Sequence, residues 1–89
     1  MLKRGNGLLK IGDIASARLV LRRAANAGNA QAAMTLGMTY DPRVLAELGV
    51  LGSVPDASQA GAWYQKAADL GSIEAQRRID QLARVDRRP

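Results

Sequence analysis

Carboxylates, hydroxyls and guanidinium groups are the side chains with which this 89-residue chain could do chemistry, because it contains no Cys and no His. Zinc and haem sites, thiol nucleophiles and His-based triads therefore lack their essential groups. Asp13 and Asp56 stand 43 residues apart in similar surroundings, which raises the possibility of acid–base catalysis by a carboxylate pair. Each one precedes an amphipathic segment, where a carboxylate accepts hydrogen bonds from first-turn amides. We therefore expect two helix N-caps, and we expect that the chain is not an enzyme.

Two other features of the sequence could indicate a binding site for a ligand, but each has a simpler explanation. Gly5-Asn6-Gly7 resembles a fragment of a phosphate loop, but no strand precedes it and no Lys-Ser/Thr follows it. The net charge of +5 gathers partly at Arg18, Arg22 and Arg23, and the four-residue spacing of the first two predicts a ridge on one helix. Our first interpretation of this ridge is a solvated helix face. The alternative is a basic helical module that binds nucleic acid or an anionic surface, but the aromatic residues that would stack on bases fall on apolar stripes instead.

The length predicts a single domain with a modest core. No apolar run approaches the ~20 residues of a membrane span, and the first residues lack the apolar stretch of a secretory signal. The residues imply no metal and no cofactor. The expected location is the cytoplasm by default, or the periplasm or envelope if the chain is excised from an exported parent protein.

An internal repeat organises the chain. The frame Ala-Ala-x-x-Gly-x-x-x-Ala occurs at Ala24–Ala32 and again at Ala67–Ala75, and the two copies align at an offset of 43 without a gap. Apolar spacing predicts helices over about 2–11, 14–27, 30–40, 57–70 and 73–84. Residues 41–56 form an inserted loop or short helix, and 85–89 form a basic tail. Gly28 and Gly71 suit the left-handed position that ends a helix, and Asn29 and Ser72 suit the cap of the next one.

The sequence resembles the Sel-one-like repeat, a relative of the tetratricopeptide repeat. The resemblance spans one full repeat from Ala32 to Ala75 and is carried by Leu36-Gly37, Tyr40, Gly49-Val50, Asp56, Ala60, Trp63-Tyr64, Lys66-Ala67-Ala68 and Gly71. It implies an all-α, right-handed superhelix of about two αα-hairpin repeats over residues 1–84. It also implies a non-catalytic adaptor or scaffold that binds a peptide or protein partner, as part of a longer bacterial protein. The stretch between Tyr40 and Asp56 is longer than the family's usual loop, which leaves the curvature there open.

The repeat assigns structural roles by position. We expect capping, tight turns or inter-helix packing from Asp13, Gly28, Ala32, Asp56, Ala60, Trp63, Tyr64, Ala67, Ala68, Gly71 and Ala75. In repeats of this class the first helix of each hairpin lines the concave face, which predicts a groove with flexible methionines on one wall and arginines on the other. The candidate partner-binding residues are Gln31, Met34, Thr35, Met38, Glu74, Arg77, Arg78 and Gln81. The alternative is that these residues have no binding role and are ordinary solvated helix residues.

The two ends of the predicted stack differ. The last helix carries a polar outer face typical of a terminal cap, whereas the first helix is a poorer cap. We therefore expect continuation into preceding repeats, or pairing with another copy, through the N-terminal helix.

Overall fold

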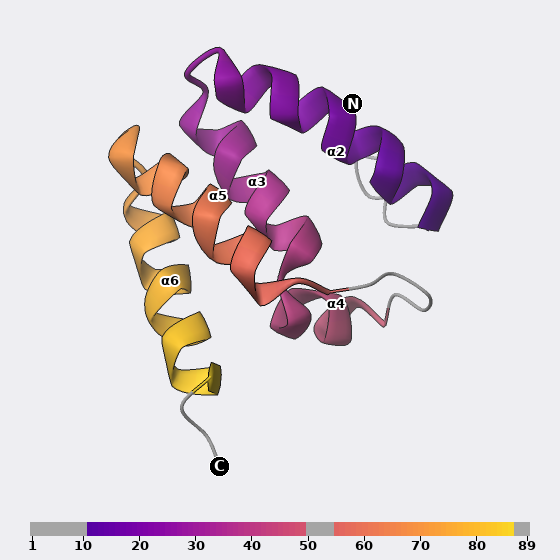
Figure 1. The fold of residues 1–89 in the computed structure, drawn as a ribbon, viewed down its shortest axis with the longest axis vertical. Coiled ribbons are helices and arrows are strands. Elements are labelled where there is room, and N and C mark those ends of the chain that lie inside the picture. Colours follow the sequence, from indigo (N-terminus) through magenta and orange to yellow (C-terminus); the bar gives the residue numbers. More distant parts are fainter. Residues whose placement is uncertain (1–10, 50–54, 87–89) are drawn as a thin grey trace.

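The computed structural model describes residues 11–49 and 55–86, and every regular element in these ranges is a helix (Figure 1). In chain order the helices are α2 (Ile11–Asn26), α3 (Ala30–Tyr40), α4 (Pro42–Leu48), α5 (Ala57–Asp69) and α6 (Ile73–Asp86). The expectation of an all-α chain is thus confirmed. The helix α3 packs against α2, α4 and α5, and α6 packs against α5. Figure 1 shows α2, α3, α5 and α6 following one another across the molecule, with α4 beside the end of α3.

The same corner joins α2 to α3 and α5 to α6. Gly28 and Gly71 have φ values of 99° and 107°, a conformation that penalises any residue with a Cβ. At the first corner Gly28 N donates to Ala25 O at 3.0 Å and Asn29 N donates to Ala24 O at 3.1 Å. The second corner repeats both bonds from Gly71 and the residue after it, at 2.9 Å each. This pair of bonds is the Schellman motif, which satisfies the last carbonyls of a helix.

The residue after each glycine also begins the next helix. Asn29 Oδ1 accepts from Ala32 N at 2.9 Å, and Ser72 Oγ accepts from Ala75 N at 3.1 Å. One residue therefore closes one helix through its backbone amide and caps the next through its side chain. The next helix must consequently leave the corner in a fixed direction.

The predicted insertion contains a short helix. Asp41 caps α4 by accepting from Arg43 N at 2.9 Å, and Pro42 fills the first position of the helix, where its missing amide costs nothing. Beyond the insertion, Asp56 N donates to Tyr40 O at 2.8 Å. The backbone is therefore bonded to itself across the insertion, and the end of α3 meets the beginning of α5 directly.

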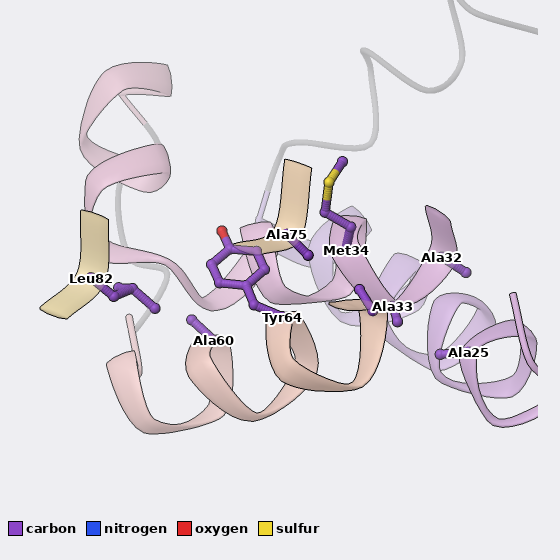
Figure 2. Close-up of a cluster of buried hydrophobic side chains, with 9 residues drawn as sticks. Ala25, Ala32, Ala33, Met34, Ala60, Tyr64, Ala75 and Leu82 are labelled. Atoms are coloured by element: carbon purple, nitrogen blue, oxygen red, sulfur yellow. The ribbon is translucent and has the colours of Figure 1, made fainter. Parts of the chain in front are cut away.

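The centre of the core lies where α3 meets α5. Ala33, Leu36, Ala60, Tyr64 and Ala67 are fully buried, and Figure 2 shows Tyr64 beside Ala60 with its hydroxyl directed away from α5. Because most of the cluster is alanine, the helix backbones approach each other closely. Tyr64 and Leu36 are the largest side chains with essentially no exposure.

A single glycine admits the tyrosine ring. A Cβ placed on Gly37 would lie 2.6 Å from both Cδ1 and Cε1 of Tyr64, and 3.2 Å from the carbonyl oxygen of Ala60. The first separation is far below van der Waals contact, so the ring rests directly on the backbone of α3. This close approach gives Gly37, which stands in the Leu-Gly pair of the repeat signature, a steric role.

The structure contradicts two sequence predictions about the beginning of α2. The predicted break before residue 14 is wrong, because the chain is already helical at Ile11. Asp13 therefore lies inside α2 and is not its N-cap. The helix continues through Gly12, although a glycine inside a helix costs about 1 kcal/mol. Of the helix predicted over about 2–11, residues 2–10 lie outside the described residues, as do residues 87–89 of the predicted tail 85–89, whose first two residues belong to α6.

Candidate partner-binding surface

The predicted groove residues on α3 divide between surface and core. Gln31 is exposed, Thr35 and Met38 are partly buried, and Met34 is buried with 8% exposure. Met34 belongs to the core cluster and accepts a weak hydrogen bond from Ser72 Oγ at 3.8 Å. Its expected place on an exposed wall is therefore wrong. Three helices pack around α3, so little of its circumference remains open.

On α6 the predicted residues form a charged ladder. Arg77 NH1 lies 3.6 Å from Glu74 Oε1, and Arg78 Nε lies 3.5 Å from Glu74 Oε2. The second pair is close enough for ionic attraction but lacks hydrogen-bond geometry, since Arg78 Nε is buried without a hydrogen-bond partner. The Arg77 side chain is 69% exposed and that of Arg78 only 21%. Arg77 is thus free to meet a partner, whereas Arg78 belongs partly to the interior.

Thr35 and Met38 line an apolar hollow among α2, α3 and α4. It has a volume of ≈ 70 Å³, and its other lining residues are Ile14, Thr39, Val44, Leu45 and Leu48. Leu48 on its wall is 48% exposed. A hollow with this lining suits an apolar side chain of a peptide. The two candidate walls do not line one groove, because Gln81 of α6 lines a separate small hollow of ≈ 10 Å³ with Asp41, Pro42, Arg43 and Leu82.

A buried polar pair joins the insertion to the core. The Tyr64 hydroxyl donates to Asp41 Oδ2 at 2.6 Å, and the two residues are 0% and 3% exposed. Burial, this hydrogen bond and the negative charge of Asp41 raise the pKa of Tyr64 far above its ordinary value, while Arg78 acts in the opposite direction. Tyr64 therefore stays protonated as a donor. Its hydrogen bond to Asp41, the N-cap of α4, holds the beginning of α4 against α5.

Two residues of the arginine ridge on α2, Arg18 and Arg22, form hydrogen bonds to the end of α3. Arg18 Nε donates to Thr39 Oγ1 at 3.1 Å, and an Arg18 NH2 group donates to the Thr39 carbonyl. Its guanidinium carbon lies 3.8 Å from the centre of the Tyr40 ring, and Arg22 NH2 donates to the Tyr40 hydroxyl at 3.3 Å. The helix end of α3 presents carbonyls that attract a cation. The four-residue spacing predicted the ridge but not this partner, which comes from another helix.

The residues predicted to have structural roles take the following places in the structure. Asp56 caps α5 by accepting from Gln59 N at 3.0 Å. Ala60, Tyr64, Ala67 and Ala75 are fully buried, and Ala32 is 7% exposed. Ala68 and Trp63 are partly buried, and Trp63 Nε1 is shielded without a hydrogen-bond partner. Tyr64, one residue further on, supplies the core aromatic.

Comparison with family models finds no match for the chain, and comparisons with curated proteins and with solved structures find none either. Among the described residues, no three or more Asp or Glu side chains gather in a way that could hold a metal ion. None of the helices in these ranges has the length and apolar character that crossing a membrane requires. The candidate surface consists of an apolar hollow, the charged group of Glu74, Arg77 and Arg78, and several exposed aliphatic side chains.

Proposed function

We propose that this protein is a non-catalytic interaction module, a short right-handed stack of Sel-one-like αα-hairpins that binds a peptide or protein partner as an adaptor or scaffold. One observation carries the proposal: the same Schellman corner, with the same shared cap, is built at Gly28 and at Gly71. Helical hairpins that recur at a fixed period bury their apolar faces against their neighbours. Their remaining surfaces serve as extended platforms for other chains.

Contacts between the helices support the same register. Arg18 of α2 bonds to Thr39 of α3, and a Cβ on Gly61 of α5 would have Leu82 of α6 as its nearest neighbour, at 4.0 Å. Both members of the second pair are 43 residues after those of the first. The two hairpins thus bring corresponding positions together across their helix pairs, as a repeating stack requires.

A nucleic-acid or anionic-surface function is the second candidate, and the net charge of +5 favours it. The described arginines argue against it in two places. Arg18 is engaged by Thr39 and Tyr40, and Arg78 lies beside the carboxylate of Glu74 with its side chain only 21% exposed. These cations already have partners that a phosphate would need to displace.

The test is a selection of binders from a random peptide library displayed on phage, with the folded chain as bait. We expect enriched peptides with apolar anchors whose purified versions bind the chain and remain bound at 0.5 M salt, where the Debye length is about half its value at physiological ionic strength. In parallel, a mixed-sequence DNA duplex and a single-stranded RNA are titrated at rising salt. Absence of any enriched peptide, together with nucleic-acid affinity that falls steeply with salt, would replace the proposal by the second candidate.

A further inference from the structure

We draw no further inference here: the strongest candidate, the apolar hollow among α2, α3 and α4, belongs to the candidate surface already described, and nothing in the described part of the chain shows what covers it.

Discussion

Exchanging each of two helical glycines for alanine separates the packing role of Gly37 from helix propensity. Gly37 lies inside α3 and Gly61 inside α5, so Gly→Ala favours the helix by about 0.5–1 kcal/mol at both sites. A Cβ at Gly37 meets two ring carbons of Tyr64 at 2.6 Å, whereas one at Gly61 has its nearest neighbour at 4.0 Å. The ring cannot swing away freely, because its hydroxyl is bonded to Asp41.

The magnitudes follow from these contacts. Overpacking costs about 1–3 kcal/mol, so Gly37→Ala should lower the free energy of unfolding by up to about 2 kcal/mol after the gain in propensity. Gly61→Ala should raise it by about 0.5–1 kcal/mol. The difference between the two variants removes the propensity contribution and leaves the steric cost alone.

Urea unfolding followed by circular dichroism measures both values, and equal m-values confirm that the variants unfold from comparable states. In a Tyr64→Leu background, the cost of Gly37→Ala should shrink, because the two sites are in contact and their effects are not additive. Equal stability of the two glycine variants would refute the steric role of Gly37.

Three further predictions concern the hydrogen-bonded pair of Tyr64 and Asp41 and the two arginines beside Glu74. Tyr64→Phe should lower the free energy of unfolding by about 1–3 kcal/mol, since the buried Asp41 loses its donor; unchanged thermal and urea midpoints would contradict this. The raised pKa of Tyr64 means that above pH ~10 the unfolded chain releases a proton that the folded chain keeps. The free energy of unfolding should therefore fall by up to about 1.4 kcal/mol for each pH unit above that value. An equal fall in the Tyr64→Phe variant would show that other groups cause it. Arg77→Ala should change the free energy of unfolding by less than about 0.5 kcal/mol, and Arg78→Ala should lower it by more. Both arginines lie beside Glu74, but only Arg78 is largely buried. Equal losses for the two variants in urea unfolding would argue against that distinction.

The local features of the fold were predictable because each is written in a few consecutive residues. Gly28 and Gly71 require a left-handed conformation, and Asn29, Ser72 and Asp56 carry oxygens that cap helices. These signals placed the corners and the beginning of α5 without knowledge of the tertiary structure. The segment 41–56 was likewise predicted to form a loop or a short helix.

The side-chain environments were less predictable, because they depend on how many helices surround each one. Helical phase with a single neighbour placed Met34 on the surface, whereas α3 has three neighbours and buries it. Asp13 looked like a cap because the pattern allowed a break that the backbone does not make. The partners of Arg18 and Tyr64 lie 21 and 23 residues away, and no local pattern names them.

The hydrogen bond from Asp56 N to Tyr40 O, at 2.8 Å, determines how the protein tolerates changes in the length of the segment between these two residues. It joins the two ends of the insertion, so added sequence between them leaves the paths of α3 and α5 unchanged. A loop closed in this way tolerates growth, since each doubling of its length costs only about 0.6 kcal/mol. The opposite change is harder, because Asp41 now holds Tyr64 and the apolar side chains of Val44 and Leu45 are buried. Lengthening the chain between Tyr40 and Asp56 should therefore cost little stability, whereas removing the segment that contains Asp41, Val44 and Leu45 should cost more.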